Sequence, residues 1–253
     1  MLKLLREYVR DFERRKTWPV NPIARSAYRV HSHGKQDGIL DAIFTALGIS
    51  SGTSVEIGAW DGITHSNTRN LLENGWTCGY IEADPDKFRE LKRNIEGLSA
   101  CALNAMVDLE LGNTLDDAID RLGLPGKLTF LCVDIDGNDY WVWKSLTRCR
   151  PQVVCIEYNA YVDPLSRLSV PYEISRSWEG DFYYGASAGA LYDLARDKGY
   201  AMVGFEPGLD LFFVREDVLA TAKLEKTPLE AVPWGLKLNP FRRQAPGKTL
   251  KPV

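Results

Sequence analysis

VEIGAWDG, residues 55–62, is the stretch from which the fold can be predicted. Val55 and Ile57 are apolar and strand-forming, and Gly62 closes a short turn before residues 63–74, which have the character of a helix. A strand, a glycine-containing turn and a helix in quick succession are typical of a nucleotide-binding crevice. Glycine accepts positive φ and lets the backbone approach a ligand closely, although glycines of this kind also serve packing alone.

The spacing of these residues differs from that of dinucleotide-binding enzymes. Glu56, Gly58 and Gly62 form the pattern E-x-G-x-x-x-G rather than G-x-G-x-x-G, which disfavours a pyrophosphate ligand. Glu82 follows 20 residues after Gly62, at the end of the next apolar run. An acidic residue at the tip of the second strand of a βαβ unit can accept hydrogen bonds from both ribose hydroxyls. We assign this role to Glu82, and the capping of the following helix to Asp84 and Asp86.

The distribution of charge bears on the class of ligand. Residues 1–30 carry eight Lys and Arg against three acids, and residues 236–253 carry five Lys and Arg and no acid. The 205 residues between them therefore have a net charge of −13, although the whole chain has only −3. An acidic body argues against a nucleic-acid substrate, whose phosphates call for a basic face. The basic ends are interpreted as solvated tails, with contact to an anionic surface or partner as the alternative.

The sequence predicts a cytoplasmic protein without a transmembrane segment. No apolar run approaches the ~20 residues that span a bilayer. Residues 1–16 have the pattern of an amphipathic helix and lack the continuous apolar core of a secretory signal. The five cysteines form an odd set without C-x-x-C spacing, which indicates buried reduced thiols. The oligomeric state is left open, and a homo-oligomer is compatible with the sequence.

Strand and helix patterns alternate along the middle of the chain. This alternation predicts an α/β fold whose mostly parallel sheet is covered on both faces. The last two strands are joined by only four residues, 206–209, so they form an antiparallel hairpin at the end of a seven-stranded sheet. We expect strands at 53–58, 77–82, 100–105, 127–134, 152–158, 200–205 and 210–214, and helices at 39–47, 63–74, 85–96, 113–122, 138–147 and 187–198.

Three segments are distinguished: an N-terminal helix and linker (1–35), the α/β domain (36–215) and a basic, Pro-rich extension (216–253). Residues 159–186 form an insertion rich in Tyr, Ser, Pro and Trp. Loops of that length inside a domain are usually functional or disordered, and the aromatic content disfavours disorder. Aromatic rings with nearby hydroxyls suit a sugar face; the alternative is that they pin the loop to the sheet. The candidate substrate-binding residues are Gln36, Asp37, Trp178, Tyr183, Tyr184 and Ser187.

Acidic residues follow the predicted strands at several neighbouring ends, where open α/β sheets bind their ligands. Asp134, Glu157 and Asn159 offer oxygen ligands from adjacent strand ends, which suits Mg²⁺ or another hard divalent cation. Two alternatives need no metal. Asp136 and Asp139 can cap the helix that follows, and Glu157 can pair with an arginine.

Four segments in order, VEIGAWDG, YIEADPDKF, VDIDGNDYWVWKSL and VVCIEYN, resemble those of the FkbM-type S-adenosylmethionine-dependent methyltransferases. The resemblance covers about residues 36–215. It implies a Rossmann-like class I methyltransferase fold, S-adenosylmethionine as cofactor, and methylation of a hydroxyl on a sugar or glycosylated metabolite. The fourth strand's element in the family usually reads D-x-E-G-x-E, so Asp136 and Asp139 depart from it.

The resemblance also implies roles for individual residues. Glu56, Gly58 and Gly62 form the loop on the methionine side, Glu82 takes the ribose, and Asp108 or a neighbour lies by the adenine. The cofactor-binding candidates are therefore Glu56, Gly58, Gly62, Glu82, Asp108 and Asp134.

Methyl transfer to a hydroxyl requires alignment of the acceptor and removal of its proton. A metal that holds vicinal hydroxyls would do both. Without a metal a general base is required, and the candidates are His65, Asp134 and Asp136. His31 and His33 form a weaker H-x-H metal motif that lacks an evident third ligand.

Two other functions are kept as alternatives. A nicotinamide-dependent oxidoreductase would use the same kind of sheet, but the G-x-G-x-x-G pattern is absent. A non-catalytic module that binds a cofactor or partner is the second, since the departures at Asp136 and Asp139 leave room for it.

Overall fold

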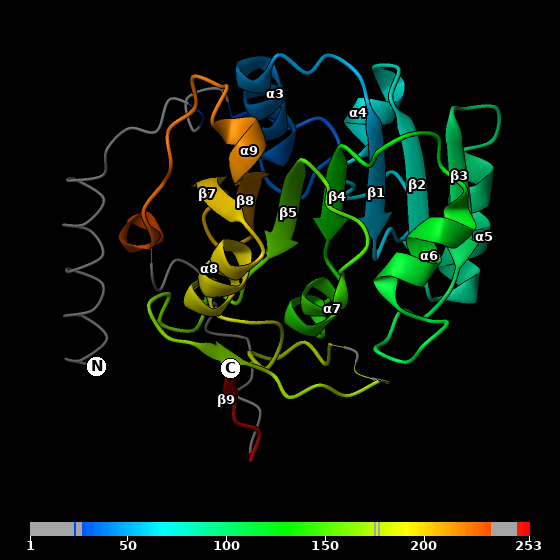
Figure 1. Cartoon of the computed structure of the whole chain (residues 1–253). Coiled ribbons are helices and arrows are strands. Elements are labelled where there is room, and N and C mark those ends of the chain that lie inside the picture. Colours follow the sequence, from blue (N-terminus) through cyan, green and yellow to red (C-terminus); the bar gives the residue numbers. More distant parts are fainter. Residues whose placement is uncertain (1–22, 24–26, 175, 177, 234–246) are drawn as a thin grey trace.

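Seven strands form one mixed sheet in the order β3-β2-β1-β4-β5-β8-β7 (Figure 1). The computed structural model describes residues 23, 27–174, 176, 178–233 and 247–253, so the predicted helix over 1–16 lies outside the described residues. The neighbouring pairs from β3 to β5 are parallel, whereas β8 is antiparallel to both β5 and β7. The strands are β1 (Thr53–Ile57), β2 (Thr77–Glu82), β3 (Ala100–Asn104), β4 (Phe130–Val133), β5 (Val153–Glu157), β7 (Tyr200–Phe205) and β8 (Asp210–Arg215). The prediction of a mostly parallel seven-stranded sheet ending in an antiparallel hairpin is confirmed.

Helices cover both faces of this sheet because alternate strand residues are apolar on each side. Val55 and Ile57 of β1 belong to one buried cluster, while Cys78 and Tyr80 of β2 belong to the other. The first cluster includes residues of α6 (Leu115–Leu122), α7 (Asp139–Ser145) and α8 (Ala188–Asp197). The second includes residues of α3 (Gln36–Leu47), α4 (Arg69–Glu73), α5 (Pro85–Asn94) and α9 (Glu216–Leu219).

The helix predicted over 63–74 is wrong for its first half, because α4 begins only at Arg69. The Asp61 carboxylate accepts the backbone N–H groups of Ile63 (2.9 Å) and Thr64 (2.7 Å), which forms a local turn in place of a helix. His65 then adopts a left-handed φ of 61°, which also interrupts a helix. Residues 63–68 are therefore a loop at the carboxyl end of β1.

The insertion (residues 159–186) lies below the carboxyl ends of β4 and β5 in the view of Figure 1. Within it, β6 (Leu168–Ser169) pairs antiparallel with β9 (Lys251–Pro252), so the end of the chain lies beside the insertion. After Arg215, α9 and the short helix η1 (Leu229–Ala231) lie within the basic, Pro-rich extension (216–253). None of the helices in the described part of the chain has the length and apolar character needed to cross a membrane.

Candidate functional site

The sheet reverses its strand order between β1 and β4, and Gly58 lies at this point. Its φ is 78°, and a Cβ on it would lie 1.8 Å from the carbonyl oxygen of Asp134, the residue that follows β4. Its N–H donates to the carbonyl of Ile81 (3.0 Å) at the end of β2. Glycine is required here both for its conformation and for the close approach of two strand ends.

Glu82, at the end of β2, reaches the turn that follows β1. One carboxylate oxygen accepts the N–H of Trp60 and the other accepts the N–H of Asp84, both at 2.7 Å. Burial raises the pKa of Glu82, and these backbone hydrogen bonds oppose the rise. Because a carboxylate has about four acceptor positions, Glu82 retains room for hydroxyl donors. Asp84 also accepts the N–H groups of Asp86 and Lys87, so its predicted role as the cap of α5 is confirmed.

Glu56 points to the face of β1 opposite to that of Val55 and Ile57, and it is buried. Its carboxylate accepts hydrogen bonds from the Ser66 hydroxyl (2.6 Å), the Thr68 hydroxyl (2.6 Å) and the Asn67 N–H (2.7 Å). Burial raises the pKa of Glu56, although these donors oppose the rise. The structure therefore uses Glu56 to hold the loop over 66–68. Gly62 closes the preceding turn with φ at 72°.

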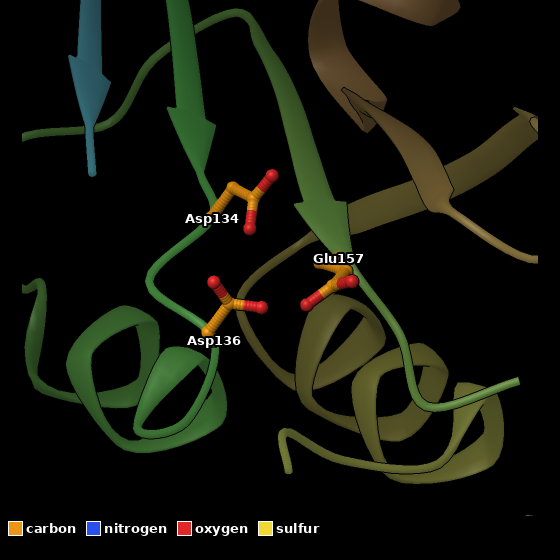
Figure 2. A group of neighbouring side chains, drawn as sticks. All are labelled: Asp134, Asp136 and Glu157. Carbon is orange, nitrogen blue, oxygen red and sulfur yellow. The ribbon is translucent and has the colours of Figure 1, made fainter. Parts of the chain in front are cut away.

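Figure 2 shows three carboxylates that converge at the carboxyl ends of β4 and β5: Asp134, Asp136 and Glu157. One oxygen of each lies within 4.8 Å of the others. Burial raises the pKa of Asp134 well above its ordinary value, and the negative charges of Asp210 and Asp136 add to the effect. Burial likewise raises the pKa of Glu157, and the charge of Asp134 is its next cause. We call these three residues the acidic cluster.

The acidic cluster fits a hard divalent cation. The Oε2 atom of Glu157 is buried and has no hydrogen-bond partner among the described residues. The alternative of an ion pair between Glu157 and an arginine is also not found within the described part of the chain. Carboxylate oxygens are the donor type that Mg²⁺ and similar hard cations prefer. A cation or a shared proton would relieve the mutual repulsion that raises the pKa values.

Asp139, the first residue of α7, shapes the turn that presents Asp136. Its carboxylate accepts the N–H groups of Ile135 (2.8 Å) and Gly137 (2.9 Å), and Asp136 between them has a left-handed φ of 54°. Burial raises the pKa of Asp139 to about 6, and the two backbone N–H groups oppose the rise. A non-glycine residue in this conformation is uncommon and is enriched at functional sites.

Gln36 and Asp210 border the acidic cluster from another direction. Asp210 lies opposite Glu157 in the antiparallel pairing of β8 with β5. The amide of Gln36 donates to Oδ2 of Asp210 (2.6 Å), so the start of α3 reaches the edge of the site. Asp37 instead accepts three backbone N–H groups of residues 30–32 and holds that loop. Of this predicted pair, Gln36 therefore lies nearer to the site.

Asn159 ties the insertion to the end of β5. Its amide nitrogen donates to the carbonyls of Phe182 (3.0 Å) and Tyr184 (2.8 Å), and its oxygen accepts the N–H of Tyr161 (3.0 Å). Because this buried side chain already serves three backbone groups, the structure gives it a role other than the predicted metal ligand. The third member of the acidic cluster is Asp136, whereas the predicted third ligand was Asn159.

The aromatic residues of the insertion divide into buried and accessible ones. Tyr184 is buried, and Ser187 caps α8 by accepting the N–H of Ala190 (3.3 Å), so both support the fold. Trp178 is 38% exposed, and Tyr183 is partly exposed. Of the predicted acceptor-binding residues on the insertion, Trp178 and Tyr183 are thus the two that a ligand can reach.

The remaining candidates lie around the site. Asp108 is buried and its carboxylate accepts the N–H of Glu110 (2.7 Å), which shapes the loop after β3. His65 is exposed, and its ring stacks on that of His33 with centroids 4.3 Å apart. His31 pairs with Glu73 (3.0 Å), so the two histidines of the H-x-H motif have different neighbours.

Asp210 and Arg176 are residues of the site that had no predicted role. Asp210 is the first residue of a strand, but only the register of that strand places it opposite Glu157. Arg176 lies in the middle of the insertion, where no periodic pattern indicates its direction. Its stem packs on Gly137, where a Cβ would lie 3.1 Å from the Cγ and Cδ atoms of the arginine.

Solved structures with a similar arrangement include S-adenosylmethionine-dependent methyltransferases. The N-terminal domain of EvdMO1 with SAH bound is 14% identical, with 81% of this chain and 94% of that chain covered and a TM-score of 0.47. A TehB-like SAM-dependent methyltransferase from Corynebacterium glutamicum is 13% identical, with 71% and 86% covered and a TM-score of 0.41. A SAM-dependent methyltransferase from Aquifex aeolicus is 12% identical, with 69% and 88% covered and a TM-score of 0.41. No protein-family model matches the chain, and no curated protein does.

Proposed function

We propose that the protein is an S-adenosylmethionine-dependent O-methyltransferase that acts on a hydroxyl of a sugar or glycosylated metabolite. The observation that carries the proposal is the position of Glu82, whose carboxylate accepts the Trp60 N–H and so lies over the turn after β1. An acid in this place is suited to the two ribose hydroxyls of an adenosyl group at the switch point. The FkbM-type segments of the sequence agree with this assignment.

Other residues complete the cofactor site in this proposal. Gly58 and Gly62 shape the turn after β1: Gly58 allows the ends of β1 and β4 to approach closely, and Gly62 leaves room for Leu91 of α5. The methionine part of the cofactor would lie along this turn. Glu56 acts through the loop over 66–68 that it holds. Asp108 shapes the loop after β3, which would border the adenine.

Bound S-adenosylmethionine supplies an electrophilic methyl group on a sulfonium. In the transfer, the acceptor oxygen forms a bond to the methyl carbon while the carbon–sulfur bond breaks, and the hydroxyl proton has to leave. Where no metal is bound, Asp134 or Asp136 accepts this proton directly or through water. Their cluster is suited to the role because burial and neighbouring charge raise the pKa of Asp134 well above its ordinary value, which makes it a stronger base.

A divalent metal would be held by Asp134, Asp136 and Glu157. Bound there, it would lower the pKa of the acceptor hydroxyl and orient vicinal hydroxyls. The observation that supports a cation is the buried Oε2 atom of Glu157, which lacks a hydrogen-bond partner among the described residues. The accessible rings of Trp178 and Tyr183 offer a surface for the acceptor.

The first experiment is calorimetric titration of the full chain with S-adenosylhomocysteine, with and without Mg²⁺. We expect micromolar binding to the wild type and at least about 10-fold weaker binding to Glu82→Gln, because a charged acceptor of two hydroxyls is lost. Glu96→Gln, an exposed acid beyond α5, is the matched control and should bind as the wild type does. Absence of binding under both conditions would contradict the proposal and turn attention to nicotinamide cofactors.

A further inference from the structure

A strip of the insertion, residues 170–174 with Arg176, crosses the loops that bear the site. The Trp141 indole N–H donates to the carbonyl of Val170 (2.8 Å), and the Asn138 amide donates to the carbonyl of Glu173 (2.7 Å). The hydroxyl of Tyr172 accepts the N–H of Leu109 (3.2 Å) in the loop after β3. The strip is thus attached to the loops after β3 and β4, and it carries Arg176 beside the acidic cluster.

Arg176 is a nearly buried cation. Its side chain is only 10% exposed, and its stem packs on Gly137, the residue next to Asp136. Among the described residues its one ion pair is with Glu173 (2.7 Å), whose own side chain is 60% exposed. The Nε atom of Arg176 is buried and has no hydrogen-bond partner among the described residues. A buried donor left in this state costs free energy unless a ligand satisfies it.

A second cation lies on the same aromatic ring. The guanidinium carbon of Arg176 lies 5.1 Å from the centroid of the Tyr183 ring, and Nζ of Lys248 lies 5.6 Å from it. Lys248 pairs with Glu179 (2.8 Å), which is 67% exposed, and lies at the longer distance of 4.0 Å from Asp181, which is 10% exposed. The pairing of β9 with β6 brings the segment after Gly247 to this place. The two short ion pairs, with Glu173 and Glu179, are to exposed carboxylates and therefore weak, so an incoming anion can displace them at small cost.

We infer that the acceptor of this enzyme carries an anionic group, a phosphate or a carboxylate, which Arg176 binds together with Lys248. Arginine suits either group because its planar fork donates paired hydrogen bonds. The Tyr183 ring, which both cations contact, provides an apolar wall for the adjoining part of the acceptor. The anion would lie next to the turn of Asp136, which places a neighbouring hydroxyl within reach of the acidic cluster. The assignment to an acceptor rests on the proposed methyl transfer, whereas anion binding itself does not.

The test measures anion and cofactor binding separately. Inorganic phosphate is titrated into the full chain and followed by calorimetry, for the wild type, Arg176→Gln and Lys248→Gln. Arg196→Gln on α8 is the matched control, because this arginine is 65% exposed and pairs only with Asp193 and Asp197 among the described residues. We expect phosphate binding to weaken about 10-fold or more in Arg176→Gln, less in Lys248→Gln, and not in the control. Each variant is also titrated with S-adenosylhomocysteine, which reports whether the fold is intact.

Two outcomes would overturn the inference, and a third would overturn the proposed function but not the anion site. Phosphate that does not bind the wild type, or binds Arg176→Gln and the control equally, would show that there is no such site. A parallel loss of S-adenosylhomocysteine binding in Arg176→Gln, with Lys248→Gln unaffected, would assign Arg176 to the cofactor's carboxylate. If S-adenosylhomocysteine fails to bind the wild type but phosphate binds through Arg176, the proposed function fails and the anion site stands.

The source of the anion is distinguished by turnover. Methyl transfer from labelled S-adenosylmethionine is compared for glucose, glucose 6-phosphate and glucuronate as probes of a neutral, a phosphorylated and a carboxylated sugar. Preference for either anionic sugar that disappears in Arg176→Gln supports the inference and identifies the group. Preference for the neutral sugar contradicts it.

Discussion

Replacing Gly58 by alanine should destabilise the protein far more than the same replacement at Gly48. Both glycines have positive φ, 78° and 69°. At Gly48 nothing lies within 4 Å of an added Cβ, so the cost is the left-handed conformation alone, about 1–2 kcal/mol. At Gly58 the added Cβ would lie 1.8 Å from the Asp134 carbonyl oxygen, and this distance has to grow to at least the 3.0 Å of real contacts.

The carbonyl of Asp134 cannot rotate away as a flexible side chain could, because β4 is paired on both sides with β1 and β5. The strand ends must therefore separate, which adds roughly 1–3 kcal/mol or more to the conformational cost. The assay is urea unfolding of the wild type and both variants at the same pH. A free-energy loss in Gly58→Ala that stays within about 0.5 kcal/mol of the Gly48→Ala loss would refute the argument for close strand approach.

Three further predictions concern the site. In Asp139→Asn, the fall in stability of the wild type between pH about 4 and 6 should become smaller. A pKa raised from 3.8 to about 6 makes the folded state bind the proton more tightly, so this contribution of Asp139 is present below the lower value and is lost as pH rises to the higher one. Urea midpoints across this range check it, and parallel curves for the two proteins contradict it. Glu157→Gln should raise the midpoint of metal-free thermal unfolding at pH 7, because it relieves repulsion among the carboxylates. It should also abolish the rise in midpoint that Mg²⁺ produces in the wild type. A midpoint that changes neither with the substitution nor with Mg²⁺ would argue against the cluster as a cation site. Asn159→Ala should lower the free energy of unfolding by about 2–3 kcal/mol, because the carbonyls of Phe182 and Tyr184 lose their donor. Asn74→Ala, at an exposed site, should lower it much less. Equal losses of the two variants in urea unfolding would contradict this role of Asn159.

The elements of the sheet could be predicted because their signals are local. Apolar strands alternate with helical patterns, and the short connection over 206–209 allows only an antiparallel hairpin. Asp84 likewise caps α5 as predicted, since a cap depends on residues two or three positions away. The helix over 63–74 failed in its first half for a related reason: Asp61 binds the backbone of the next residues, and this local competition outweighed the apolar spacing.

The composition of the candidate site was predicted in part. Acidic residues at strand ends identify the correct edge of the sheet, because parallel strands end together. The sequence does not tell which side chains turn inward there. Asn159 seemed equivalent to the acids by position, yet its amide binds the insertion, while Asp136 reaches the acidic cluster because Asp139 folds the intervening turn.

By itself, the sequence determined the strands, their alternation with helices, and the glycines and acids at the carboxyl edge. These depend on hydrophobic periodicity and turn chemistry among near neighbours. Only the tertiary structure brought Asp210 opposite Glu157, joined Gln36 to Asp210 across 174 positions of the chain, and placed Arg176 against Gly137. Such contacts depend on strand register and on the docking of a long insertion, which are set by packing between distant segments rather than by local pattern.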